Sequence, residues 1–116
     1  MELAILDFQQ LRIKHIAYKS KVRSVLYGGS YENGYFQNSN PVALWFIETG
    51  NLKYRHEPRF EKLKKLHQQF SKLSEELVAI YQNDLIEQAH NGLVDLNALS
   101  DLFLQELAAA EQVYIR

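Results

Sequence analysis

The sequence contains no cysteine, which excludes disulfide bonds, thiolate zinc sites and cysteine redox switches. No apolar run approaches the ~20 residues that span a bilayer, so we expect no membrane insertion. The formal net charge is −1, so the composition favours neither a nucleic-acid surface nor a polybasic membrane patch. The amino-terminal residues show no basic start followed by an apolar block, as a secretory signal would. These absences together predict a cytoplasmic location.

The 116 residues suit a single domain covering residues 1–116. Hydrophobic residues make up 47% and charged residues 23%, a profile typical of soluble globular chains. We find no internal repeat, no low-complexity tract and no alternation of polar and apolar residues that would indicate a strand. The sequence therefore predicts an all-α fold.

Apolar residues recur three and four residues apart in three long stretches, which is the spacing of a helix face. This spacing predicts helices over about 2–27, 58–90 and 96–114. We expect Gly28 to end the first helix, because glycine readily takes the left-handed conformation of a helix cap. Asp95 is the expected cap of the last helix.

A short fourth helix is predicted over 41–49. Asn40 is a favourable N-cap, and Pro41 suits the first helical position because its missing N–H would be unpaired there anyway. We expect Gly50 to end this helix, and residues 28–39 to form a loop held down by its aromatic residues. Three long helices and one short helix with brief connections predict an antiparallel four-helix bundle.

Two histidines interrupt the apolar faces of predicted helices. His15 lies at the centre of the first face and His67 at the centre of the face in 58–90. A buried histidine without a partner is costly, so each is either a core residue bonded to a carbonyl, a hydroxyl or trapped water, or part of a shared metal or anion site. A third possibility is that the helix register is wrong and both are at the surface. His56 and His90 are expected at the surface.

Several motifs occur in a characteristic order. The residues concerned are His15, Tyr18, Lys19, Asn40, Trp45, Gly50, His67 and Ser71. Over about residues 11–77 the sequence resembles the chemoreceptor zinc-binding (CZB) domain, a cytoplasmic four-helix bundle of bacterial chemoreceptors and diguanylate cyclases. That family carries a zinc-ligand His followed by Trp and Lys, then Cys-x-Leu-Gly-x-Trp with a ligand Cys, then His-x-x-x-His. Trp45 matches the tryptophan of the second motif.

The resemblance implies a zinc site with parts missing. His15 and His67 match two ligand positions, but Asn40 replaces the Cys, Ser71 replaces the second motif His, and Tyr18 replaces the first-helix Trp. A structural zinc site uses four nitrogen or sulfur ligands, and neutral oxygen groups are poor substitutes. We therefore expect a vestigial site that binds zinc weakly or not at all, and no resident cofactor.

The resemblance also implies a sensory or regulatory role, in which a change of helix packing carries the signal. The implied partners are a second copy of the chain and a signalling output domain or protein. The alternatives are a ligand-free structural or dimerisation module and a weak metal-binding protein. The sequence has no nucleophile motif, phosphate-binding glycine loop or HExxH, so we expect no enzyme. A second apolar strip available for dimerisation comprises Leu3, Ile5, Ile13, Leu85, Ile86 and Val113.

Overall fold

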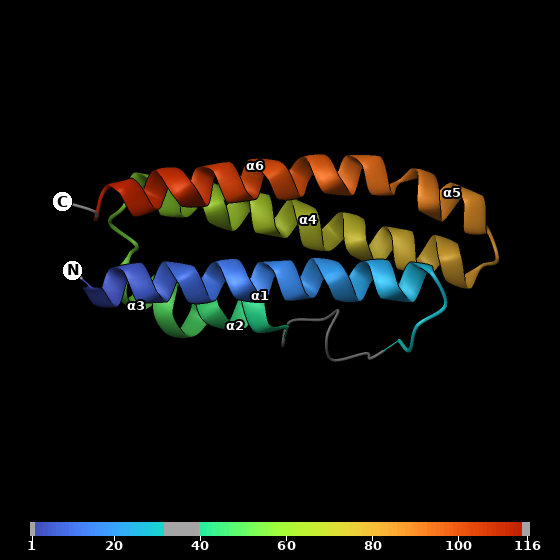
Figure 1. Cartoon of the computed structure of the whole chain (residues 1–116), viewed down its shortest axis with the longest axis horizontal. Helices are drawn as coiled ribbons and strands as arrows, with labels where there is room; N and C mark the ends of the chain where they lie inside the picture. Colours follow the sequence, from blue (N-terminus) through green and yellow to red (C-terminus); the bar gives the residue numbers. More distant parts are fainter. Residues whose placement is uncertain (1, 32–39, 115–116) are drawn as a thin grey trace.

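The computed structural model describes residues 2–31 and 40–114, and these residues form helices and loops without any strand. The prediction of an all-α fold is confirmed. Three long helices, α1 (Glu2–Leu26), α4 (Pro58–Gln82) and α6 (Leu93–Gln112), lie side by side along the longest axis of the molecule (Figure 1). Within the described ranges, no helix combines the length and the apolar character needed to cross a membrane.

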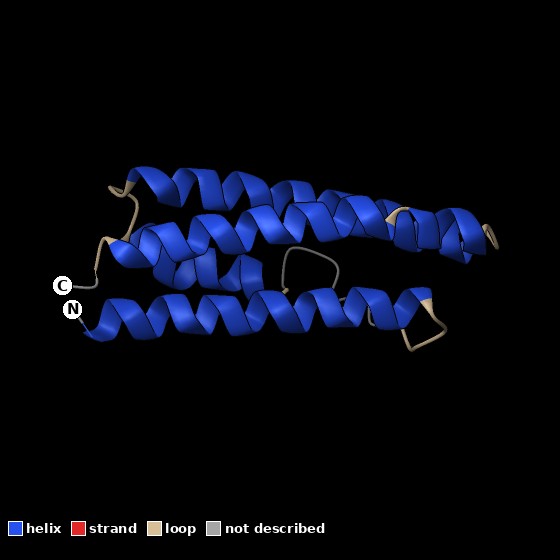
Figure 2. Cartoon of the chain, turned by 45° about the horizontal axis from the view of Figure 1, so that its top comes forward, coloured by secondary structure: helices blue, strands red, loops and turns tan. Residues whose placement is uncertain are grey.

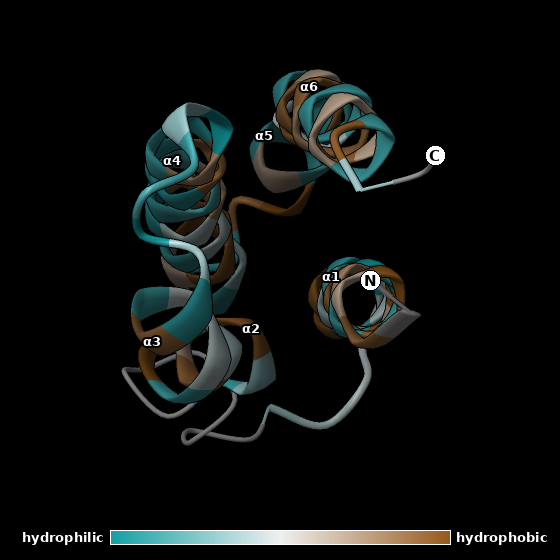
Figure 3. Ribbon diagram, turned by 90° about the vertical axis from the view of Figure 1, so that its left-hand side faces the viewer, coloured by the Kyte–Doolittle hydropathy of each residue, from teal (hydrophilic) through white to brown (hydrophobic). Residues whose placement is uncertain are grey.

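The shorter elements lie along and between the long helices. Three of them follow one another without a break: α2 (Pro41–Trp45), η2 (Phe46–Gly50) and α3 (Asn51–Lys53). They run opposite to α1 and α4, as α6 does, and α5 (Ile86–Asn91) joins the far end of α4 to α6 (Figures 1 and 2). Seen end on, α2 and α3 lie beside α4, while α1 and α6 lie on the other side of the molecule (Figure 3).

The end of α1 is as the sequence predicts. Gly28 has a φ of 97°, the left-handed conformation that closes a helix at low cost only for glycine. Its N–H donates to the carbonyl of Val25 at 3.1 Å, and the N–H of Gly29 donates to the carbonyl of Ser24 at 2.7 Å. The predicted loop over 28–39 lies mostly outside the described residues.

The start of the short helix is also confirmed, but its end is not. The side-chain oxygen of Asn40 accepts the N–H of Ala43 at 2.9 Å, so it caps α2. The predicted stop at Gly50 is wrong, because the chain passes through this glycine in helical conformation and continues to the end of α3. A Cβ on Gly50 would collide with the ring of Phe60, so close packing rather than helix termination accounts for this glycine. Glu57 caps the following helix by accepting the N–H of Arg59 at 3.3 Å.

The predicted helix over 58–90 is interrupted in the structure. Helix α4 ends at Gln82, and Asp84 takes a φ of 66° before α5 begins. Aspartate tolerates this left-handed conformation better than most residues, because its short polar side chain can bond locally. The prediction of one continuous helix is therefore wrong, and the chain turns at this point.

The last helix begins earlier than predicted. Helix α6 starts at Leu93, which places Asp95 in its first turn rather than at its cap. Gly92, between α5 and α6, has a helical φ of −70°. A Cβ at this glycine would collide with the side chain of Leu77, so α5 reaches α6 over a close contact with α4.

One apolar core runs between the long helices. Its largest fully buried side chains are Tyr18, Phe8, Phe70, Phe103, Leu11, Leu26, Leu63, Leu96 and Leu107. Trp45 is in this core, with its ring 6.0 Å from that of Phe8. Its indole N–H donates to the carbonyl of Asp7 at 3.0 Å, which fixes α2 to α1.

Ion pairs join the helices at the rim of the core. Arg12 on α1 makes two hydrogen bonds to the carboxylate of Glu111 on α6, where the glutamate side chain is largely buried. Glu106 on α6 is bonded to Arg59 at 2.8 Å and paired with Lys62 at 3.3 Å, both on α4. Because the side chains of these two α4 partners are about half exposed or more, the second group is more weakly stabilising than the first.

Candidate functional site

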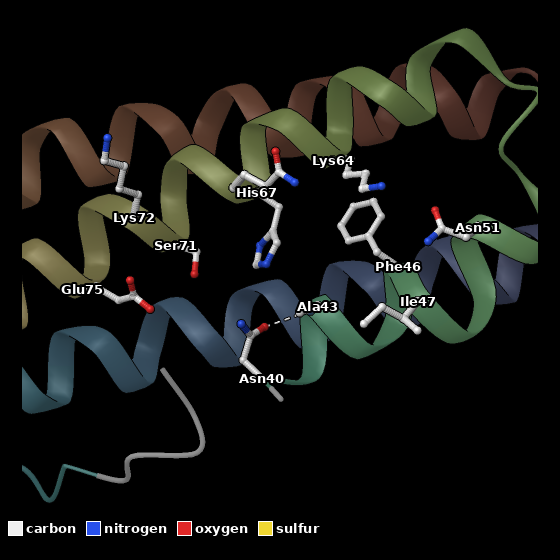
Figure 4. Close-up of a pocket in the computed structure, with 11 residues that line it drawn as sticks. Asn40, Ala43, Phe46, Ile47, Asn51, Lys64, His67, Ser71, Lys72 and Glu75 are labelled. Carbon is white, nitrogen blue, oxygen red and sulfur yellow. Dashed lines mark hydrogen bonds between the residues drawn. The ribbon is translucent and has the colours of Figure 1, made fainter. Parts of the chain in front are cut away.

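A cavity of about 570 Å³ opens between α4 and the segment α2–η2 (Figure 4). This volume lies within the roughly 300–1,000 Å³ that small-molecule sites occupy. The α2–η2–α3 wall contributes Asn40, Ala43, Phe46, Ile47 and Asn51. The α4 wall contributes Lys64, His67, Gln68, Ser71, Lys72 and Glu75.

Three of the four residues predicted to form a site line this cavity. His67 and Ser71 are four residues apart on α4 and therefore share a face of that helix. Asn40 faces them from the cap of α2 (Figure 4). The structure thus brings Asn40, His67 and Ser71 together, whereas His15 does not line the cavity.

His67 forms the buried part of the cavity wall. Its side chain points from α4 into the space between the helices (Figure 4), and the residue is only 5% exposed. The Nδ1 atom has no hydrogen-bond partner among the described residues. Its ring centre lies 5.8 Å from that of Phe46 and 6.0 Å from that of Tyr18. Burial lowers the pKa of His67 to about 4, so the imidazole is neutral near pH 7.

His15 lies behind the cavity, inside the core. Its Nε2 atom is 2.9 Å from the hydroxyl of Ser100 on α6, and its ring stacks on Phe103 with centres 4.4 Å apart. Burial is the main cause that lowers the pKa of His15 to about 4, and electrostatic interactions with His67 and Lys19 lower it further. His15 therefore matches the expectation of a core histidine bonded to a hydroxyl.

Tyr18, Asn40 and Trp45 were also singled out by the sequence, and they are held in place by contacts around the cavity. The hydroxyls of Tyr18 and Ser71 are 3.1 Å apart, and Tyr18 is fully buried. Asn40 is 2% exposed and caps α2. Trp45 packs in the core against the cavity residue Phe46, with ring centres 5.2 Å apart, and does not itself line the cavity.

The donor set is a poor match to a zinc site. Across residues 2–31 and 40–114 there is no group of three or more His, Cys, Asp or Glu side chains placed to hold a metal ion. At the cavity, His67 offers one imidazole, while Asn40 and Ser71 offer an amide and a hydroxyl. A tetrahedral zinc site uses nitrogen, thiolate or carboxylate ligands. Weak or absent zinc binding stays a prediction, and these residues alone do not suit the metal.

Sequence reasoning missed the charged residues around the cavity. Gln68, Lys72 and Glu75 are exposed and Lys64 is half-buried, so these four residues line the outer part of the cavity beside the buried His67. Helical spacing from His67 does not select this set, because residues one and five positions away lie about 100° and 140° around the helix. These residues become a cavity wall only because α2–η2 packs opposite them.

Two structural partners were also missed. Ser100 interrupts the apolar face of α6 between Leu96 and Phe103, and a small polar residue at such a position indicates a buried hydrogen bond. His90, expected at the surface, is instead half-buried: its Nε2 bonds the carbonyl of Leu26 and its ring stacks on Tyr27 at 4.1 Å. It therefore joins α5 to the end of α1.

Comparison with known proteins adds no relative to this picture. No family model, no curated protein and no solved structure matches the chain.

Proposed function

We propose that the chain is a sensory or regulatory domain of the CZB type, bacterial and cytoplasmic, in which the zinc site is partly lost. In this proposal the helices form an antiparallel four-helix bundle, with α2, η2 and α3 as the short fourth member. One observation carries the proposal: Asn40, His67 and Ser71 stand at three positions where the resemblance expects zinc ligands, and all three line one cavity. Asn40 and His67 belong to different helices, so helix periodicity alone does not bring them together.

The position of the cavity suits a signal carried by helix packing. Its two walls are α4 and α2–η2, and the second wall is fixed to α1 by the indole bond of Trp45 to the carbonyl of Asp7. A molecule bound between the walls would favour one spacing of α4 relative to α1. A ligand shifts such an equilibrium only as far as it binds one arrangement better than the other. This role needs binding but no catalysis, so we propose a non-enzymatic protein whose partner is a signalling output domain or protein.

Zinc titration of the wild-type chain and of one double variant tests the proposal. The wild-type chain should bind zinc weakly, because His67 is the one imidazole at the cavity. The double variant Asn40→Cys, Ser71→His adds a thiolate and an imidazole to the same cavity, so binding should become at least about a hundredfold tighter, or about 3 kcal/mol. Competition with a chromogenic chelator measures both affinities.

A matched control places the same two residue types elsewhere. The variant Asn83→Cys, Ser20→His changes two exposed positions that do not line the cavity. Its zinc affinity should stay close to that of the wild-type chain. If the cavity variant binds zinc no more tightly than this control, the three positions do not act as one site and the proposed relationship is wrong.

A dimerisation module is the second candidate, favoured by an exposed apolar strip on α1. Leu3, Leu6, Ile13 and Ile16 are each at least half exposed. We propose that a second copy of the chain covers this strip. Light scattering after gel filtration should give a dimer mass, and Ile13→Lys should give a monomer. A monomeric wild-type chain would remove this candidate.

A further inference from the structure

The cavity carries an excess of positive charge on its α4 wall. Lys64 and Lys72 both line it, and neither forms an ion pair with a residue in the described ranges. By contrast Lys62, on the same helix, is paired with Glu106 at 3.3 Å. The one carboxylate among the lining residues is Glu75, three residues after Lys72 and hence on the same side of the helix. The lining residues therefore carry two ammonium groups against one carboxylate, a formal excess of one positive charge.

The surroundings of Lys64 are polar on one side and apolar on the other. His67, three residues further along α4, points into the cavity beside it (Figure 4). Its neutral imidazole has one N–H and one lone pair to offer a ligand. Its Nδ1 is buried without a partner among the described residues, so a small rotation of the ring or contact through Nε2 is needed to reach a ligand. Across the cavity Phe46 and Ile47 present apolar side chains from η2 (Figure 4). Lys64, His67 and the apolar wall thus meet within one half of the cavity.

We infer that this half of the cavity binds a small organic carboxylate with an apolar body. The carboxylate is held by Lys64 and hydrogen-bonded by His67, and the apolar body packs on Phe46 and Ile47. The inference rests on the proposed sensory function and specifies the class of its ligand. A metal cation is disfavoured here by the ammonium groups, and a fully hydrated anion such as phosphate makes no use of the apolar wall.

Benzoate is the probe, added to the full chain at low ionic strength. The ring signals of His67 in proton–carbon NMR spectra should shift and saturate with added benzoate. Benzamide has the same shape without the charge, and inorganic phosphate has the charge without the ring. Both should bind at least about threefold more weakly than benzoate. If benzamide binds as tightly as benzoate, the ligand's charge does not contribute to binding. If phosphate binds as tightly as benzoate, the apolar wall does not contribute to binding. Either result overturns the inference.

Two adjacent lysines give a matched pair of variants. Lys64→Gln should weaken benzoate binding about three- to fivefold, the size expected for one partly exposed charge. Lys65→Gln removes the same charge from the next residue, which is exposed and does not line the cavity, and should leave the affinity unchanged. Equal weakening by the two variants, or no saturable shift at any benzoate concentration, overturns the inference.

The zinc titration separates this inference from the function on which it rests. If the variant Asn40→Cys, Ser71→His binds zinc tightly while benzoate fails to bind, the shared site stands and the ligand class is wrong. If both fail, the proposed function is wrong as well.

Discussion

Acidification should destabilise this protein because it buries two neutral histidines. Burial lowers the pKa of both His15 and His67 from 6.5 to about 4. In the unfolded chain both return to the ordinary value, so between pH 6.5 and pH 4 the unfolded state binds more protons than the folded state. The free energy of unfolding therefore falls as the pH falls through this window, and it is unaffected by these groups above about pH 7.

The size of the effect follows from the two pKa values. At pH 5 each unfolded histidine lies about 1.5 units below its pKa and is mostly charged, while each folded one is mostly neutral. Each histidine then lowers the free energy of unfolding by about 2 kcal/mol, and the two together lower it by about 4 kcal/mol. A domain of this size is stable by roughly 5–15 kcal/mol, so the melting temperature should drop by about 10–20 °C between pH 8 and pH 5.

Circular dichroism melts at pH 8, 6.5 and 5 measure this loss, and stopping at pH 5 limits the contribution of carboxylates. His56→Gln, at an exposed position, is the control variant for the loss of one histidine. His67→Gln should retain only about half of it, when each protein is compared with its own value at pH 8. An unchanged melting temperature between pH 8 and pH 5, or full pH dependence in His67→Gln, would refute the reasoning.

Two further predictions compare matched residues by urea unfolding at pH 8. Ser100→Ala removes the hydroxyl bonded to His15 and should cost about 1–3 kcal/mol, because it leaves a buried imidazole without that partner. Ser74→Ala should cost less than about 1 kcal/mol, since its hydroxyl only donates to a carbonyl of its own helix; equal losses would contradict the role given to Ser100. Glu111→Gln breaks a largely buried, two-bonded pair with arginine and should cost about 1–3 kcal/mol. Glu106→Gln should cost at most about 1 kcal/mol because its partners are substantially exposed, and the reverse order would falsify this ranking.

Glycine shows where sequence reasoning succeeded and where it failed. The stop at Gly28 could be predicted, since its positive φ is a local property of a helix end. Gly50 and Gly92 have helical φ values, and their small size matters because Phe60 and Leu77 approach them from other parts of the chain. Such approaches depend on the tertiary fold, so the predicted helix boundaries near these two residues were wrong.

The sequence could likewise place some residues of the candidate site but not others. Helical spacing was enough to place His67 and Ser71 on one face, and Asn40 at the start of a helix. The partner of His15 could not be deduced from α1 alone, because Ser100 belongs to a helix 85 residues further along the chain. His90 was misjudged for a similar reason: its environment is set by the end of α1 rather than by its own helix.

The π-helical turn η2 determines the direction in which the residues before it face. A turn of this kind accommodates one more residue than an α-helical turn over the same length of axis. Each residue of an α-helix rotates the chain by about 100°. Deleting one residue between Phe46 and Gly50 would therefore swing Asn40 around the axis by about that angle, away from the cavity that it now lines. The orientation of the cavity's second wall is thus encoded in a single inserted residue.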